Sequence, residues 1–322
     1  MGVHCSSFGE SYTGDDAVVR VRRRAMGCEF ELVLCGRDRD YLVDAGNEAF
    51  EEVERLEEQM SVFIPTSEIS YINAAAASEP VRVEPRLFEL FQTAARLSEE
   101  TDGAFDITAG AMVRLWDSSA DGAPSKEQTT AVLEATGMSK VLLDRSKSTI
   151  RFADPGVKLN LGALGKGYAV AQVVELLVER RVESALVSAG TSTVYALGSP
   201  PDDDAWSVGI RSPVERDKRV GSIRLRDRAL STSGIHERFI EIDGEKYGHI
   251  MDPRNGQPAD GLLAAAAIAS DPAESDALST AFFIMGIDAA RMYCERHAGV
   301  GAVLIAEGQS DSNVEIIRIG VS

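Results

Sequence analysis

His249, one of only four histidines in the sequence, stands just ahead of a charged corner formed by Asp252, Pro253 and Arg254. An imidazole titrates near neutral pH, so His249 can act as a general base without a large pKa shift. Pro253 and the Asn-Gly pair that follows the corner restrict the backbone there. A lone histidine is more often structural than catalytic, and this stretch alone leaves both roles open.

A second stretch with chemical potential is ESDALST, residues 274–280, in which Asp276 and Thr280 are four residues apart and Ser279 lies beside them. On a helix Asp276 and Thr280 share a face. A carboxylate with one or two hydroxyls is an all-oxygen set of the kind that Mg²⁺ accepts. Simple capping of the helix by Ser275 or Asp276 explains the same residues, and from this stretch alone capping is favoured.

A third stretch, residues 159–169 (LNLGALGKGYA), places three glycines and Lys166 where a helix is expected to begin. Exposed N–H groups, the positive end of a helix dipole and one lysine together suit a diphosphate. The spacing matches neither of the common phosphate-loop patterns. A glycine turn that packs a helix against a sheet explains the stretch equally well.

A fourth stretch, residues 100–110 (ETDGAFDITAG), ends a helix with turn residues and continues into Phe105 and Asp106. Phe105 can stack on a flat ring, and Asp106 can accept a hydrogen bond from it. A place in the hydrophobic core is the simpler explanation for Phe105.

Composition limits the partners. The chain has 322 residues and a formal net charge of -18, which disfavours nucleic acid and anionic membranes as partners. An anionic substrate then needs local cations or a metal ion. The four cysteines form no CxxC pair, and there is neither a signal-peptide core nor a membrane-spanning run. We expect a soluble, cytoplasmic chain as written, and a parent that is exported with a trimmed leader stays open.

The order of elements indicates an α+β fold. Residues 1–17 are expected to be a disordered lead-in, and residues 18–322 to form one domain, as a single body or as two intimate lobes. Periodicity predicts helices over residues 41–60, 85–103, 125–137, 165–182, 273–286 and 288–297. It predicts strands over residues 18–36, 140–144, 148–152, 184–190, 193–198, 206–211, 221–227, 229–234, 238–242, 301–307 and 314–320, and an apolar, central strand over residues 262–270.

Taken together and in order, several stretches resemble the successive motifs of the FAD:protein FMN transferases, the ApbE-type flavin transferases. They are AMGCEFEL, MSVFIPTSEISYIN, TDGAFDITAG, LNLGALGKGYA, STSGIHERFIEIDGEKYGHIMDPRNGQP and ESDALSTAFFIMG. The resemblance runs from about Val18 to the C-terminus. The Thr-Asp-Gly-Ala-Phe-Asp block and the block from His249 to Gly256 are its most specific parts.

The resemblance implies a T-fold type of α+β architecture, FAD as substrate and Mg²⁺ as metal. Members transfer the FMN half of FAD to a threonine or serine of an acceptor protein, within a short Asp-x-x-[Ser/Thr]-Gly-Ala-Thr-like motif, and release AMP. It implies a catalytic role for His249, metal binding by the main-chain oxygen of Ala163 and by Asp276, Thr280 and Ser279, and cofactor contacts from Met26, Phe63, Ala104, Phe105, Asp106, Asn160, Lys166 and Ile250.

Two positions depart from the family pattern. Asn160 stands where an aspartate is usual, which removes a charge, and Gly190-Thr191-Ser192-Thr193 replaces a Gly-Gly-acid pattern. Two other functions therefore stay open beside the transferase. One is a Mg²⁺-dependent FAD pyrophosphatase that gives FMN and AMP, and the other is a non-catalytic flavin-binding protein.

Overall fold

The computed structural model describes residues 3–5, 17–118, 122–215, 218–234, 239–242, 245–308 and 314–321. Within them the helices are α1 Arg39–Met60, α2 Glu68–Ala75, α3 Pro85–Glu100, α4 Gly110–Asp117, α5 Lys126–Ala135, the 3₁₀ turn η1 Met138–Lys140, α6 Gly165–Glu179, α7 Pro272–Met285 and α8 Ile287–Arg296. The strands are β1 Val3–Cys5, β2 Ala17–Ala25, β3 Cys28–Gly36, β4 Val81–Arg82, β5 Val141–Asp144, β6 Thr149–Phe152, β7 Ser184–Ala189, β8 Thr193–Leu197, β9 Trp206–Arg211, β10 Arg219–Leu225, β11 Arg228–Gly234, β12 Phe239–Ile242, β13 Glu245–Gly248, β14 Met251–Asp252, β15 Gln257–Pro258, β16 Ala264–Ala269, β17 Gly301–Glu307 and β18 Val314–Ile319.

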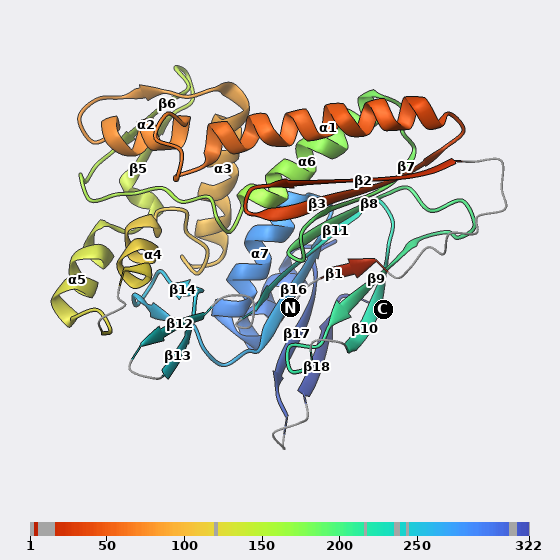
Figure 1. The fold of residues 1–322 in the computed structure, drawn as a ribbon. Coiled ribbons are helices and arrows are strands. Elements are labelled where there is room, and N and C mark those ends of the chain that lie inside the picture. Colours follow the sequence, from red (N-terminus) through yellow and green to blue (C-terminus); the bar gives the residue numbers. More distant parts are fainter. Residues whose placement is uncertain are drawn as a thin grey trace.

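An eight-stranded antiparallel sheet, in the order β18-β17-β16-β11-β8-β7-β3-β2, forms the centre of the molecule. One face carries helices: α1 packs on β2 and β3, and α7 packs on β11 and β16 (Figure 1). The other face is covered by β9 and β10, whose inward residues share a second core with β8, β11 and β16. The α+β prediction is therefore confirmed, with the helices gathered on one face of the sheet.

Local signals explain where several helices begin. Asp38 caps α1 by accepting from the N–H of Tyr41 at 3.0 Å, and Ser125 with Gln128 forms a capping box at α5. α7 begins at Pro272, directly after the cap residue Asp271, which accepts from the N–H of Glu274 at 2.9 Å. The predicted strand at 262–270 is β16; it lies between β11 and β17 and is buried at every position, as its apolar sequence indicated.

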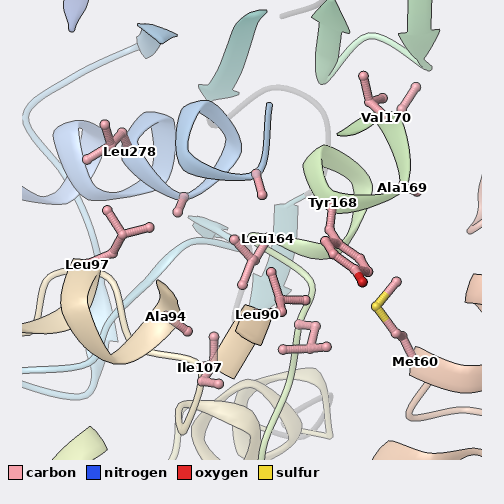
Figure 2. Packing of buried hydrophobic residues seen from close by; sticks show 14 of the residues in the cluster. Met60, Leu90, Ala94, Leu97, Ile107, Leu164, Tyr168, Ala169, Val170 and Leu278 are labelled. Carbon is pink, nitrogen blue, oxygen red and sulfur yellow. The ribbon is translucent and has the colours of Figure 1, made fainter. Parts of the chain in front are cut away.

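The main core fills the space between the helices and the sheet. In Figure 2, side chains of α3, α6 and α7 meet in this layer, with Leu97 and Leu278 facing across it and the ring of Tyr168 directed toward Met60. Burial of Tyr168 raises the pKa of its phenol to about 12. Because α6 and α7 share this core, the segment before α6 is placed against α7.

Of the lead-in expected over residues 1–17, the structure describes Val3–Cys5, which pair with β9 as β1, and Ala17, which begins β2. The other residues of that segment lie outside the described residues. Periodicity did not predict the short elements α2, α4, η1, β4, β13, β14 and β15. Among the described residues, no helix combines the length and apolar character that crossing a bilayer requires.

Candidate functional site

The beginning of α6 is fastened to α7 by a hydrogen bond between main chain and side chain. The N–H of Gly167 donates to Oδ2 of Asp276 at 2.9 Å, and Asp276 is only 3% exposed. A Cβ on Gly167 would lie 2.3 Å from the carbonyl oxygen of Pro272 and 2.6 Å from Cβ of Asp276. Gly167 therefore packs α6 closely against α7, a helix and not the sheet that the packing explanation named, and the same contact fixes a buried carboxylate.

Asp276 does not cap its helix. The cap is Asp271, five residues earlier, and the hydroxyl of Ser275 donates to the carbonyl of Ala267 at 2.9 Å. The capping explanation for Ser275 and Asp276 is therefore wrong. With Oδ2 bonded to Gly167, Oδ1 of Asp276 has no hydrogen-bond partner in the described part of the chain, and Thr280 follows on the same face of α7.

Three hydroxyls gather beside Asp276. Ser279 donates to the main-chain oxygen of Asp276 at 2.8 Å, and its own oxygen lies 2.9 Å from the hydroxyl of Ser233 at the end of β11. The hydroxyl of Ser233 also lies 3.1 Å from Oγ1 of Thr280. Ser233 therefore joins the sheet to the two hydroxyl residues of α7.

The loop before α6 holds the other expected ligands. Gly167, whose N–H would bond the carbonyl of Ala163 in a regular helix, bonds Asp276 instead, and no other group of the described residues donates to that carbonyl. Oδ1 of Asn160 accepts from the N–H of Gly162 at 2.8 Å, so the amide closes a local turn. Nζ of Lys166 lies 3.4 Å from the carbonyl of Gly162.

Main-chain bonds bring the loop after α3 to the loop before α6. The N–H of Asn160 donates to the carbonyl of Ile107 at 2.7 Å, and the N–H of Gly110 donates to that of Lys158 at 3.0 Å. Asn73, the last polar residue of α2, makes two hydrogen bonds to the backbone of Leu159 in the loop before α6. Its side chain donates to the carbonyl of Leu159 at 2.9 Å and accepts from the N–H of Leu159 at 2.7 Å. The cofactor residues expected at 104–106 and at 160 are thus neighbours through their backbones.

The side chains of Phe105 and Asp106 are occupied in this structure. Phe105 is 2% exposed and belongs to the main core, as the simpler explanation held. Both oxygens of Asp106 accept hydrogen bonds, Oδ1 from the N–H and hydroxyl of Thr108 at 2.7 and 2.6 Å and Oδ2 from the N–H of Met138 at 3.0 Å. Burial nevertheless raises the pKa of this carboxyl. Ala104 is fully buried as well.

The corner after His249 is held by an ion pair. Arg254 donates Nε to Oδ1 of Asp252 at 2.8 Å and Nη2 to Oδ2 at 2.7 Å, a bidentate geometry that raises the pKa of the guanidinium. Nη2 also reaches the carbonyl of Ile284 at 3.4 Å, one helical turn beyond Thr280. The corner is therefore tied to the same helix that carries Asp276.

His249 lies between β13 and β14, half-buried, and Ile250 beside it is 8% exposed in the main core. The Asn-Gly turn is held from behind by α4, because Nε1 of Trp116 donates to the carbonyl of Gly256 at 3.0 Å. Met251 packs with Trp116 and Met112 in a small third core. α4, which periodicity did not predict, and α5, which it predicted over residues 125–137, thus both support the corner.

Met26 and Phe63 lie on turns. Met26 has a positive φ of 50° in the turn between β2 and β3 and packs partly against the main core. Phe63 lies between α1 and α2 with 89% of its surface exposed. Among the described residues, no hydrogen bond joins either turn to α7.

The second departure, residues 190–193, covers the turn between β7 and β8 and Thr193, the first residue of β8. Gly190 has φ 57° and donates its N–H to the carbonyl of Glu29 at 2.9 Å. The hydroxyl of Thr232 donates to the carbonyl of Thr191 at 3.0 Å. The turn is thus bonded to both β3 and β11, one residue away from Ser233.

Sequence reasoning assigned no role to Asn73 or to Arg254, although the structure shows that both hold parts of the site. An asparagine near the end of a helix is a poor helix former, which is a weak signal of a tertiary hydrogen bond. The motif MSVFIPTSEISYIN contained that signal. The bidentate pair of Arg254 with Asp252 two residues earlier could also have been proposed, because the two side chains share one face of an extended or turning backbone.

The arrangement offers the donors that a hard cation and a diphosphate would need. Among the described residues no three His, Cys, Asp or Glu side chains gather as a metal cluster, so a cation here would rest on one carboxylate, hydroxyl and carbonyl oxygens, water and substrate. That is a donor set typical of Mg²⁺. The N-terminus of α6 and Lys166 supply the positive charge beside it.

Comparison with known proteins gives a consistent result. A family model described as the ApbE family matches residues 26–304. A protein of Klebsiella pneumoniae named FAD:protein FMN transferase is 30% identical over 264 residues, 81% of each chain. A Treponema pallidum protein of the same name is 33% identical over 278 residues, which is 80% of this chain and 76% of that one.

Solved structures agree with these sequences. The ApbE protein of Thermotoga maritima has a TM-score of 0.84 at 29% identity and covers 94% of this chain and 97% of its own. The flavin transferase ApbE of Vibrio cholerae has a TM-score of 0.83 at 24% identity, with the same coverage. The second likeness shows the common fold.

Proposed function

This chain belongs to the ApbE family, and we propose that it is a Mg²⁺-dependent FAD:protein FMN transferase. In the proposed reaction the FMN half of FAD passes to a threonine or serine hydroxyl of an acceptor protein, and AMP leaves. The names of the relatives in Klebsiella pneumoniae and Treponema pallidum support the activity. The metal, the acceptor hydroxyl and the release of AMP are what the resemblance to the family implies, and the oxygen donors of the site support the metal.

The proposal rests on two oxygen atoms that accept no hydrogen bond from the described residues, although the residues that carry them are held in place by other contacts. The N–H of Gly167 bonds Oδ2 of Asp276, so Oδ1 of that carboxylate has no partner among the described residues. Because this N–H is used there, it does not bond the carbonyl of Ala163, and no other described residue donates to that carbonyl. Thr280 adds a hydroxyl on the face of Asp276. The chemistry of this donor set fits Mg²⁺.

The diphosphate of FAD would lie at the beginning of α6. Its helix dipole and the side chain of Lys166 favour an anion there. This local positive charge is needed because the whole chain carries a net charge of -18 and would otherwise repel the substrate. Asn160 and its bond to Gly162 shape the loop just before it.

The flavin would be bordered by Met26, Phe63 and Ile250. The ring of Phe63, 89% exposed, has an open face on which an isoalloxazine can stack. Because Phe105 and Ala104 are buried and both oxygens of Asp106 already accept hydrogen bonds, the 104–106 segment would meet FAD through its main chain. This differs from the stacking and side-chain hydrogen bond that the sequence suggested.

The reaction requires positioning and charge neutralisation more than covalent help from the protein. The acceptor oxygen forms a bond to the phosphorus on the flavin side, the bridging P–O bond breaks, and the bridging oxygen leaves with AMP. His249 would take the proton of the acceptor hydroxyl, and the Asp252–Arg254 pair would keep its corner fixed. Bound Mg²⁺ supplies positive charge to the diphosphate and to the departing AMP.

The experiment incubates the purified protein with FAD and Mg²⁺, with and without a domain that carries the threonine motif, and follows AMP and acceptor mass. AMP together with an acceptor heavier by one FMN unit supports the transferase. AMP with free FMN and an unmodified acceptor supports the pyrophosphatase. Intact FAD in both samples supports a flavin-binding protein, and Asn160 would then be the first residue to replace with aspartate.

A further inference from the structure

We propose that Ser233 is a positioning residue for the metal site. Its hydroxyl oxygen accepts the hydrogen bond that Thr280 donates, so the lone pairs of the Thr280 oxygen stay available to bind the cation. The inference rests on the proposed function, because it concerns the same Mg²⁺ site. It also removes Ser279 from the set of metal ligands.

The direction of one hydrogen bond in this group is fixed by its chemistry. Oγ of Ser279 lies 2.8 Å from the main-chain oxygen of Asp276. A carbonyl oxygen can only accept a hydrogen bond, and a serine has one hydroxyl hydrogen, so Ser279 donates its hydrogen to this bond. Ser279 is fully buried, so no water competes for that hydrogen.

The remaining directions follow by counting hydrogens. Oγ of Ser233 lies 2.9 Å from Oγ of Ser279, which has no hydrogen left, so Ser233 must donate to Ser279. Oγ1 of Thr280 lies 3.1 Å from Oγ of Ser233, whose hydrogen is now used, so Thr280 must donate to Ser233. The chain of bonds therefore runs from Thr280 through Ser233 and Ser279 to the helix backbone.

This order decides which hydroxyl can serve a cation. The hydrogen of Thr280 points toward Ser233, and its lone pairs carry no hydrogen bond from any residue that the structure describes. The oxygen of Ser279 already accepts from Ser233. Thr280 is also partly exposed, whereas Ser279 is fully buried. A partner that orients a ligand in this way usually changes metal affinity when it is removed.

Ser231 provides a matched control. It lies two residues earlier on β11 and so on the same face, and it is buried. Its hydroxyl bonds Oγ1 of Thr193 at 3.1 Å rather than any residue of α7. Ser231→Ala removes a hydroxyl from the same strand without touching the chain of bonds to Thr280.

The test titrates Mn²⁺, which accepts the same oxygen ligands as Mg²⁺, into the full-length protein with and without FAD and follows free Mn²⁺ by electron paramagnetic resonance. We expect Ser233→Ala to weaken Mn²⁺ binding by about 10- to 100-fold. Ser233→Thr, which keeps the hydroxyl, should restore most of the affinity, and Ser231→Ala should bind as the wild type does. Urea unfolding of each variant checks that the fold is kept.

A double variant separates the two roles of Ser279. If Ser279 acts only as the acceptor for Ser233, Ser233→Ala combined with Ser279→Ala should bind Mn²⁺ no more weakly than Ser233→Ala alone. Additive losses would show that Ser279 is itself a ligand and would overturn the proposed order.

Two further results overturn the inference: wild-type affinity in Ser233→Ala, or no Mn²⁺ binding by the wild type in either condition. Failure of the proposed function is a different result. In that case the acceptor gains no FMN, yet the Mn²⁺ affinities still follow the expected order.

Discussion

Replacement of Gly167 by alanine probes the contact on which the proposed metal site depends. The added Cβ would lie 2.3 Å from the carbonyl oxygen of Pro272, 2.6 Å from Cβ of Asp276 and 2.9 Å from Cα of Ala273. These neighbours belong to the backbone of α7 or lie next to it, so no flexible side chain can give way. α6 and α7 would have to separate, and the bond from the N–H to Asp276 would lengthen.

The size of the effect follows from three contributions. Overpacking of a closely packed contact lowers the free energy of unfolding by about 1–3 kcal/mol. Alanine in place of glycine within a helix raises it by about 1 kcal/mol. A hydrogen bond to a charged group contributes about 1.5–3 kcal/mol, part of which is lost as the bond lengthens. We expect Gly167→Ala to lower the free energy of unfolding by about 1–4 kcal/mol and to weaken Mg²⁺ binding.

Gly165→Ala is the matched control for stability. Gly165 begins the same helix, and a Cβ there would meet only Cβ of Leu161, at an ordinary 3.7 Å. Its free energy of unfolding should equal that of the wild type or exceed it by up to about 1 kcal/mol. Urea unfolding and Mg²⁺ titration calorimetry measure both variants. Equal stability and equal Mg²⁺ affinity of Gly167→Ala and Gly165→Ala would refute the reasoning.

Three further predictions concern His249, Asn160 and Asp106. His249→Asn should bind FAD normally but slow AMP release by on the order of 10²–10⁴-fold in a single-turnover assay, and unchanged turnover would remove its assignment as base. Asn160→Asp should keep the bond from Gly162 and add a negative charge beside the cation, so calorimetry should show tighter Mg²⁺ binding; weaker binding would count against that placement. Because burial raises the pKa of Asp106 in the folded state, its contribution to stability falls as pH rises from about 3.9 toward the folded value. Asp106→Asn, which does not titrate, should therefore lose less stability relative to wild type at the upper end of that window, and a constant difference in urea unfolding across it would contradict the shift.

Much of the fold could be predicted because its signals are local. Three elements show this. The acidic, periodic segment of α1, the capping box at Ser125 and the all-apolar sequence of β16 each predict their element from neighbouring residues alone. α2 and α4 were missed because each spans eight residues, too few for periodicity to show.

The candidate site was less predictable because its bonds join distant segments. Asp276 and Thr280 are recognisable as a pair on one helix, but Asp276 is held by Gly167, 109 residues earlier in the chain. Ser233 likewise meets Thr280 only because β11 lies beside α7. Residue types suggested the donors, whereas the directions and partners of their hydrogen bonds required the order of strands in the sheet.

The central claim is that an acceptor hydroxyl, and not water, attacks the phosphorus of FAD. The most direct measurement runs the reaction with a threonine-motif acceptor in water enriched in ¹⁸O and weighs AMP, FMN and the intact acceptor by mass spectrometry. The account predicts a flavinylated acceptor and AMP, neither of which contains ¹⁸O, because the new bond uses the threonine oxygen and AMP keeps the bridging oxygen. An unmodified acceptor with ¹⁸O in FMN or AMP would contradict it, and so would FAD that stays intact.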